Sequence, residues 1–365
     1  MKKIILFIDN LGPGGAQRQV ANVAVLLKKA GYDTSVLVYQ DIPFYKPILD
    51  ENDISVSLVE SKNNVSRIRN IRKYLNKSGA YAVIAFLATP CFVACVSKIG
   101  HKKWKLITTE RSAKLATFTS RKFKFYNKFE RFADAKVGNS HNAIRMWQKY
   151  YPQYNDKYSV IYNHIMVPDE YLSCEHEYKA EGKVRLSVAA SYQTLKNPLA
   201  VIEAVNMLSD EQKNVLKLDW YGRAEITTGN TEVYDAAVRL IKEYNLEKCI
   251  SLNDETNEIY KIMTESDAVG LFSTVEGLPN TICEAMTIGR PVVMSKVSDY
   301  DVLVTDNGYL CDPNSVESIK DALVKLIDTP KEELERMGRA SREKAKDLFS
   351  GEAITRQWID IIERL

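Results

Sequence analysis

The sequence lacks several features that mark specialised classes of protein. No stretch of its 365 residues offers about 20 nearly uncharged apolar residues, which argues against a membrane-spanning helix. Cysteine and histidine are scarce, with six and four residues, and no cysteines form a Cys-x-x-Cys pair. We therefore expect reduced thiols in a cytosolic protein and no zinc site. The N-terminal apolar run, Ile4–Ile8, is short and favours a first β-strand over a signal peptide.

The composition is that of an ordinary soluble globular protein, with 45% hydrophobic and 27% charged residues. It excludes a collagen, a mostly disordered chain and a small cystine-rich module. The net charge of +3 conceals an asymmetry. Residues 1–180 carry 28 Lys and Arg against 15 Asp and Glu, a net +13, and residues 181–365 carry 22 against 32, a net −10. This split suggests two halves with different partners, the basic half meeting something anionic.

Strand patterns alternate with helix patterns along the chain, and the length favours two domains. In the first half we predict strands at Ile4–Asp9, Thr34–Tyr39, Ile54–Leu58, Ala82–Phe86 and Leu106–Thr109. The pattern restarts near residue 182, with strands predicted at Arg185–Ala190, Leu216–Tyr221, Cys249–Leu252, Ala268–Phe272, Pro291–Met294 and Gly308–Cys311. Helices between parallel strands indicate an α/β fold. We expect two Rossmann-like, doubly wound parallel-sheet domains facing across a cleft, over 1–175 and 176–350, and a last helix over 351–365 that crosses back to the first domain.

The first predicted strand runs into a glycine-rich turn over Leu11–Arg18. Glycines such as Gly14 and Gly15 let a ligand approach the backbone closely, and the helix that follows offers N–H groups and the positive end of its dipole. A dinucleotide fingerprint would need a third glycine where Gln17 stands, so that match is incomplete. A tight strand-to-helix turn without a ligand is the alternative.

The strongest candidate segment runs over Ser273–Met286 and carries two carboxylates, Glu276 and Glu284. Backbone N–H groups between them, at the start of a predicted helix, favour an anionic or hydroxylated ligand. A loop carboxylate also accepts hydrogen bonds from the vicinal hydroxyls of a sugar or ribose. Glu284 fits a capping box with Thr281, which is its structural alternative. A glycosidase is disfavoured, because these two carboxyls would meet the separation of about 5–9 Å that hydrolysis needs only by accident.

Two further loops that follow predicted strands carry candidate cations. Lys196, at the start of a predicted helix, is placed to bind a phosphate, and a solvated surface lysine is the alternative. Thr108–Ser112, which contains Glu110 and Arg111, occupies the corresponding place in the first half.

Basic and aromatic residues interleave over Lys114–Phe132. A single helix over this segment would place four aromatic side chains on one face beside basic residues: Phe118, Phe125, Phe129 and Phe132. Such a helix suits an anionic membrane surface. Binding to single-stranded nucleic acid and a core-packed helix with a basic outer face are the competing interpretations.

The setting Glu-Gly-Leu-Pro-Asn-x4-Ala-Met, which begins at Glu276, resembles the Glu-x7-Glu signature of the retaining nucleotide-sugar glycosyltransferases of family 4, which have the GT-B fold. The resemblance covers nearly the whole chain. Gly12–Arg18 looks like the family's N-terminal glycine loop, and Lys196–Pro198 is similar to its lysine loop. Asn163 and Asn307–Leu310 also fit. The likeness is to members of the bacterial surface-polysaccharide type.

The resemblance implies a role for each matching residue. Glu276 would hold the hydroxyls of the donor sugar, Glu284 those of the ribose, and Lys196 would neutralise the diphosphate leaving group. The same motifs imply the remaining donor-binding positions, which are Gly14, Gly15, Gly277, Leu278, Pro279 and Asn280.

The chain departs from the family pattern at one cation. Members normally carry an arginine four or five residues before the lysine, where residues 190–192 of this chain are not basic. Arg111 or Arg18 would have to supply that charge. Many members also carry a histidine where this chain has Glu110 and Arg111. No Asp-x-Asp metal motif stands out, so we expect a metal-independent reaction, without a cofactor, in which the acceptor attacks from the front face.

We therefore expect a retaining glycosyltransferase that moves a sugar from a nucleotide diphosphate, with UDP as the expected nucleotide. The acceptor would be an undecaprenyl-type lipid-linked or growing surface glycan, such as O-antigen, capsule or exopolysaccharide. The enzyme would work in the cytoplasm on the inner face of the cell membrane, with Lys114–Phe132 of the acceptor-facing domain against anionic lipid and no nucleic-acid partner. A UDP-sugar 2-epimerase of the same two-domain fold and a non-catalytic sugar- or lipid-binding protein are the alternatives.

Overall fold

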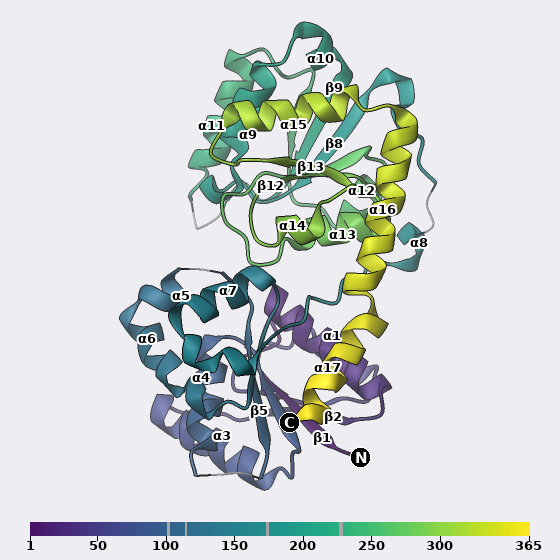
Figure 1. Cartoon of the computed structure of the whole chain (residues 1–365). Coiled ribbons are helices and arrows are strands. Elements are labelled where there is room, and N and C mark those ends of the chain that lie inside the picture. The colour runs from purple at the N-terminus through teal and green to yellow at the C-terminus, as the bar shows by residue number, and fades with distance from the viewer. Residues whose placement is uncertain (101–102, 114, 173–174, 226–228) are drawn as a thin grey trace. The chain divides into compact units, whose positions relative to one another are not determined.

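The strands of the described chain form two sheets in which every strand pair is parallel. The computed structural model describes residues 1–100, 103–113, 115–172, 175–225 and 229–365 (Figure 1). Two compact units divide the chain: Met1–His164 together with Ser350–Leu365, and Ile165–Phe349. The chain therefore leaves the first unit at His164 and returns to it at Ser350.

The first unit holds a seven-stranded sheet in the order β3-β2-β1-β4-β5-β6-β7. The five strands predicted for this half are confirmed, and the structure adds two that the sequence pattern did not indicate. The strands are β1 (Lys3–Phe7), β2 (Asp33–Val38), β3 (Ser55–Leu58), β4 (Ala82–Ala85), β5 (Lys105–Glu110), β6 (Ala135–Gly138) and β7 (Tyr158–Val160).

Strand β6 was missed because a lysine interrupts its apolar pattern. Lys136 is only 3% exposed, and its ammonium lies 3.0 Å from a Glu130 carboxylate oxygen. The other Glu130 oxygen accepts a hydrogen bond from the Thr108 hydroxyl at 2.7 Å. Burial is the strongest single influence and lowers the pKa of Lys136, but the Glu130 carboxylate and other nearby acidic groups, Glu110 among them, together outweigh burial and hold that pKa above its ordinary value. A buried charge is tolerated only with such a partner, which sequence spacing does not reveal.

Helices flank this sheet, and the last helix of the chain packs against the first (Figure 1). Trp358 and Ile362 of that last helix are buried, which anchors it to the first unit. The helices of the unit are α1 (Gly15–Lys29), α2 (Lys46–Asp50), α3 (Asn64–Lys77), α4 (Ala88–Lys98), α5 (Ala116–Thr119), α6 (Arg121–Asn127), α7 (His141–Tyr150) and α17 (Gly351–Arg364), with 3-10 helices η1 (Lys128–Phe132) and η2 (Pro152–Lys157).

The single helix predicted over Lys114–Phe132 is wrong, because the segment forms α5, α6 and η1 instead. Lys114 itself lies outside the described residues. Ser120 has an extended backbone and caps α6 through its side chain, which separates α5 from α6. Phe118 is consequently buried against the α7 aromatic side chains and does not share a face with Phe125, which is 52% exposed.

The second unit holds a six-stranded sheet in the order β10-β9-β8-β11-β12-β13, and all six predicted strands are confirmed. They are β8 (Val184–Ala189), β9 (Leu216–Tyr221), β10 (Ile250–Asn253), β11 (Ala268–Leu271), β12 (Val292–Ser295) and β13 (Gly308–Cys311). Its helices are α8 (Asp169–Leu172), α9 (Pro198–Asn206), α10 (Asp210–Val215), α11 (Glu232–Glu243), α12 (Ile259–Thr264), α13 (Asn280–Ile288), α14 (Tyr300–Leu303), α15 (Val316–Asp328) and α16 (Lys331–Phe349), with 3-10 helices η3 (Ala180–Gly182) and η4 (Thr194–Lys196). The carboxyl ends of parallel strands share one edge, so the loops that follow them gather there.

The cysteines that the structure describes are free and buried. Cys91 and Cys95 lie on one face of α4 in the core of the first unit. Burial raises the pKa of the Cys91 thiol to about 12, so this side chain stays protonated and behaves as a small apolar residue. Cys174 lies outside the described residues.

Candidate functional site

Two loops of the second unit bring a predicted carboxylate and a predicted cation together. Glu276 lies between β11 and α13, and Lys196 lies between β8 and α9. The Lys196 ammonium is 2.6 Å from Glu276 Oε1, which also accepts a hydrogen bond from the Ser273 hydroxyl at 2.7 Å. The backbone N–H of Thr274 donates to the Leu195 carbonyl at 2.8 Å, which ties the two loops to each other. Contacts within and between the two loops therefore fix the position of Lys196 relative to Glu276.

Glu276 keeps one carboxylate oxygen for a ligand. Its Oε1 takes both hydrogen bonds, and no side chain in the described part of the chain donates to its Oε2. The Glu276 side chain is 14% exposed, so solvent or a ligand reaches it. The loop around it is fixed, because the Ser298 hydroxyl donates to the Gly277 carbonyl and Leu278 is buried. A positioned carboxylate with an open oxygen suits a hydroxyl donor.

The capping box that was the structural alternative for Thr281 and Glu284 does not form. Helix α13 has Pro279 as its N-cap, which provides no side-chain hydrogen bond. Thr281 lies inside the helix, and its hydroxyl donates instead to the Ala189 carbonyl at the end of β8, at 3.2 Å. Glu284 lies on the same helix, with the Tyr260 hydroxyl 3.5 Å from its Oε1. The capping box is therefore not the role of Glu284.

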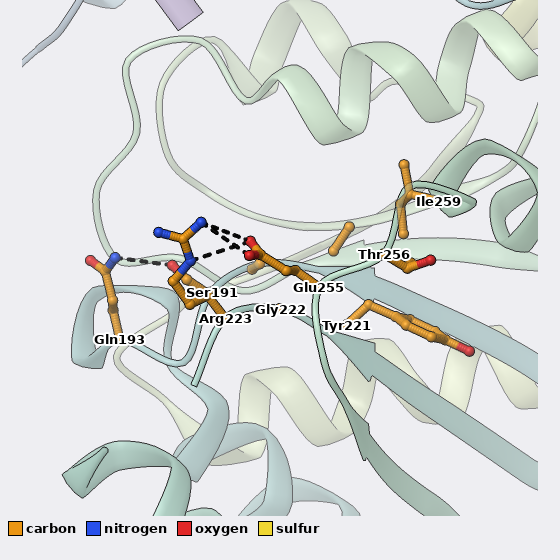
Figure 2. Close-up of a pocket in the computed structure, with 10 residues that line it drawn as sticks. Ser191, Gln193, Tyr221, Gly222, Arg223, Glu255, Thr256 and Ile259 are labelled. Carbon is orange, nitrogen blue, oxygen red and sulfur yellow. Dashed lines mark hydrogen bonds and ion pairs between the residues drawn. The ribbon is translucent and has the colours of Figure 1, made fainter. Parts of the chain in front are cut away.

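A pocket of about 440 Å³ lies at the carboxyl ends of β8, β9 and β10 (Figure 2). The pocket is next to the predicted residues at two places. The carbonyl of Ala189, a lining residue, accepts the hydrogen bond from Thr281 of α13. Ile259, another lining residue, precedes Tyr260 on α12, whose hydroxyl lies near Glu284. The lining residues are Ala189, Ala190, Ser191, Gln193, Tyr221, Gly222, Arg223, Glu255, Thr256 and Ile259.

Arg223 and Glu255 form an ion pair at this pocket, and sequence reasoning named neither. Figure 2 shows the two side chains pointing toward each other, with nitrogen–oxygen distances of 3.0 to 3.3 Å. Both side chains are more than 60% exposed, so the pair contributes little to stability. Their position after the ends of β9 and β10 was the signal that could have identified them.

The glycine-rich turn belongs to the first unit, and its backbone does not require glycine. Gly14 is the N-cap of α1 with an extended φ of −150°, and Gly15 is the first helical residue. A Cβ atom at Gly14 would meet only the flexible side chain of Gln17, and a Cβ atom at Gly15 would have no atom within 4 Å. Open space at Gly15 is consistent with close approach of a ligand to the backbone.

Arg111 and Glu110 lie at the carboxyl end of β5, also in the first unit. One Glu110 carboxylate oxygen accepts hydrogen bonds from the backbone N–H groups of Arg111 and Ser112, both at 3.0 Å. The other accepts from the Trp147 indole N–H at 3.0 Å. Glu110 therefore anchors the loop that presents Arg111.

The two Rossmann-like parallel-sheet units define the GT-B fold, which confirms the fold class expected from the sequence. Among solved structures, the chain is similar to HepE of Anabaena in complex with UDP, with a TM-score of 0.82, 17% sequence identity and all of both chains covered.

Sequence comparisons support a glycosyltransferase with this fold. Residues 175–344 match the family model described as glycosyl transferases group 1. The chain is 26% identical to an uncharacterized glycosyltransferase of Haemophilus influenzae. That alignment of 376 residues covers 99% of this chain and 100% of the Haemophilus protein. The chain is also 24% identical over 306 residues, 80% of each chain, to the N-acetylgalactosamine-N,N'-diacetylbacillosaminyl-diphospho-undecaprenol 4-alpha-N-acetylgalactosaminyltransferase of Campylobacter jejuni.

Proposed function

We propose that this chain is a retaining family 4 glycosyltransferase that transfers a sugar from a UDP-sugar to a lipid-linked or growing surface glycan. The observation that carries the proposal is the Lys196–Glu276 pair beside the start of α13 and the adjoining pocket. The Campylobacter relative supports a diphospho-undecaprenol acceptor, because its name specifies one. The HepE structure supports UDP, because it contains that nucleotide.

In the proposed complex, the pocket beside Arg223 and Glu255 accepts the base, and Glu284 accepts the ribose hydroxyls. The diphosphate lies against Lys196 and the backbone N–H groups over Gly277–Asn280. Fixed N–H dipoles and an ammonium stabilise the negative charge that develops on the leaving diphosphate. Protein cations, of which Lys196 is the one proposed in the second unit, then do this work without a metal.

Glu276 and its loop would orient the sugar, through the hydroxyls that reach its open carboxylate oxygen. The acceptor hydroxyl attacks the anomeric carbon on the face from which the diphosphate leaves. The bond between that carbon and the diphosphate oxygen breaks, and the acceptor proton passes to the departing oxygen. The anomeric configuration is retained without a covalent enzyme intermediate.

An assay of nucleotide release with a panel of nucleotide sugars and glycan acceptors tests this function. We expect Glu276→Gln to lower kcat by about a hundredfold, because it removes a charge-assisted contact to the reacting sugar. Glu243→Gln, on the exposed side of α11, is the matched control and should behave as wild type. Full turnover by Glu276→Gln, or an inverted product by NMR, contradicts the proposal. A 2-epimerase would convert the donor without an acceptor, and a binding protein would convert nothing.

We also propose peripheral binding of the first unit to an anionic membrane surface. Among the described residues, no helix is both long and apolar enough to cross a membrane. The segment over α6 and η1 carries exposed side chains that suit lipid headgroups and their apolar boundary: Arg121, Lys122, Lys124, Phe125, Lys128 and Arg131. Each lysine near such a surface contributes about 1 kcal/mol of attraction.

Co-sedimentation with vesicles tests the membrane proposal. Replacing Lys122 and Lys124 by glutamate should weaken binding to vesicles with anionic lipid by more than about tenfold. Neutral vesicles should bind wild type weakly. The matched control exchanges two exposed lysines of the second unit, Lys242 and Lys325, and should bind as wild type. Wild-type binding that ignores the anionic lipid content rules the proposal out.

A further inference from the structure

A polar cluster lies at the carboxyl edge of the sheet in the first unit. It is built from residues that follow neighbouring strands: Phe86 after β4, Arg111 after β5, Asn139 after β6 and Asn163 after β7. The Arg111 guanidinium donates to the Asn163 side-chain oxygen and lies over the Phe86 ring, 5.6 Å from its centroid. The Asn139 amide donates to the Arg111 carbonyl at 3.4 Å. The sheet edge therefore presents Arg111 in a defined place.

Arg111 is a positive charge without a bonded counter-charge. In the part of the chain that the structure describes, no carboxylate lies within ion-pair distance of its guanidinium. The carboxylate oxygens of the neighbouring Glu110 accept hydrogen bonds from the backbone N–H groups of Arg111 and Ser112 and from the Trp147 indole. Burial lowers the pKa of Arg111 to about 10, opposed by the charge of Glu110. Holding a desolvated cation beside a neutral amide is costly, so the arrangement favours an anionic ligand.

Arg290, a buried arginine of the second unit, makes more hydrogen bonds through its guanidinium than Arg111 does. Arg290 is 3% exposed and donates to the Met263 carbonyl at 3.1 Å, the Thr264 carbonyl at 2.8 Å and the Tyr178 hydroxyl at 3.3 Å. Arg111 has one such side-chain partner and remains partly exposed, so its other N–H groups are within reach of a ligand. The fold therefore shields the Arg290 guanidinium from ligands, whereas that of Arg111 is accessible.

We propose that Arg111, supported by Asn163 and Asn139, forms a phosphoryl-binding site in the first unit. The planar guanidinium fork matches two oxygens of a phosphoryl group, and the aromatic ring beneath it restricts its orientation. This inference rests on the proposed function only for the source of the phosphoryl group. That source is either the diphosphate of the sugar donor or the phosphate that links the acceptor glycan to its lipid.

Binding of inorganic pyrophosphate to the full chain tests the site without any turnover. Lys196→Gln removes the cation next to Glu276, and the further loss of binding that Arg111→Gln causes in this variant reports on Arg111. We expect Lys196→Gln with Arg111→Gln to bind pyrophosphate about tenfold or more weakly than Lys196→Gln alone, because a charge-assisted contact is lost. Arg111→Lys should be intermediate, since it keeps the charge and loses the fork. Arg69→Gln, exposed on α3, is the matched control.

Equal pyrophosphate binding by Lys196→Gln with and without Arg111→Gln, at equal thermal stability, overturns the proposal. If Arg111→Gln does not fold, wild-type crystals soaked with tungstate decide instead. Density at the Arg111 guanidinium supports the site, and density confined to other places overturns it.

Steady-state kinetics of Arg111→Lys identify the source of the phosphoryl group. A rise of about tenfold in KM for the nucleotide sugar alone assigns the donor diphosphate. The same rise for a phosphate-bearing acceptor, but not for its phosphate-free glycan, assigns the acceptor. Unchanged KM values for both substrates overturn the proposal. If wild type transfers no sugar at all, the proposed function fails, while the pyrophosphate and tungstate results still decide this site.

Discussion

At the scale of single residues, a substitution at Gly15 distinguishes an effect on stability from an effect on ligand binding. The position is helical and has open space where a side chain would begin. Alanine is a better helix former than glycine, so Gly15→Ala should leave the melting temperature unchanged or slightly higher. The added methyl group should raise KM for a substrate by about tenfold, because it occupies the space through which a ligand approaches the backbone.

Thermal unfolding and steady-state kinetics check this prediction together. Gly31→Ala, at the other end of α1, is the control with the opposite pattern. Gly31 has a φ of +90°, so alanine there should cost about 1 kcal/mol of stability and leave KM unchanged. Wild-type kinetics in Gly15→Ala would show that the turn is only a structural connection.

At the scale of elements, the close contact between the loops after β8 and β9 shapes the pocket. A Cβ atom at Gly222 would lie 2.0 Å from the Ala190 carbonyl oxygen, and the Tyr192 N–H donates to the Arg223 carbonyl at 3.1 Å. Gly222→Ala must therefore push the two loops apart. We expect it to cost about 1–3 kcal/mol of stability and to weaken nucleotide binding, because the pocket lining moves.

Chemical unfolding and nucleotide titration of Gly222→Ala measure both effects. Gly15→Ala adds the same methyl group where space is open, and it is the matched control for stability. A Gly222→Ala protein with wild-type stability would mean that these loops separate without cost, which would argue against a preformed pocket.

At the scale of the whole molecule, the first unit is completed by the end of the chain. Helix α17 buries Trp358, Ile361 and Ile362, and the Tyr32 hydroxyl donates to Glu363 at 2.7 Å. Removing residues 351–365 exposes this apolar face and its partners on α1. Each large apolar side chain lost contributes roughly 2 kcal/mol, so we expect the first unit to be destabilised by several kcal/mol.

Hydrogen exchange resolved by segment checks this prediction. Amides of the first unit should lose protection in the truncated chain, while those over Ile165–Phe349 keep theirs, because that unit has its own core. Uniform loss of protection in both units would show that they unfold as one.

The strands of both sheets were largely predictable, because strands buried on both faces are continuous apolar runs. Two strands and one predicted helix of the first unit are the exceptions. Strand β6 contains Lys136, whose partner Glu130 comes from a separate helix, and β7 has only three residues. The segment over Lys114–Phe132 has helical spacing throughout, but the cap at Ser120 divides it.

The sequence by itself determined the α/β class, most strands and the candidate residues Glu276 and Lys196, because periodicity and post-strand position are local properties of the chain. Only the tertiary structure decided that those two side chains meet, that Thr281 holds β8 instead of capping α13, and that Arg223 and Glu255 line a pocket. These contacts join residues up to 92 positions apart. They depend on which strands lie side by side, and spacing along the chain carries no record of that.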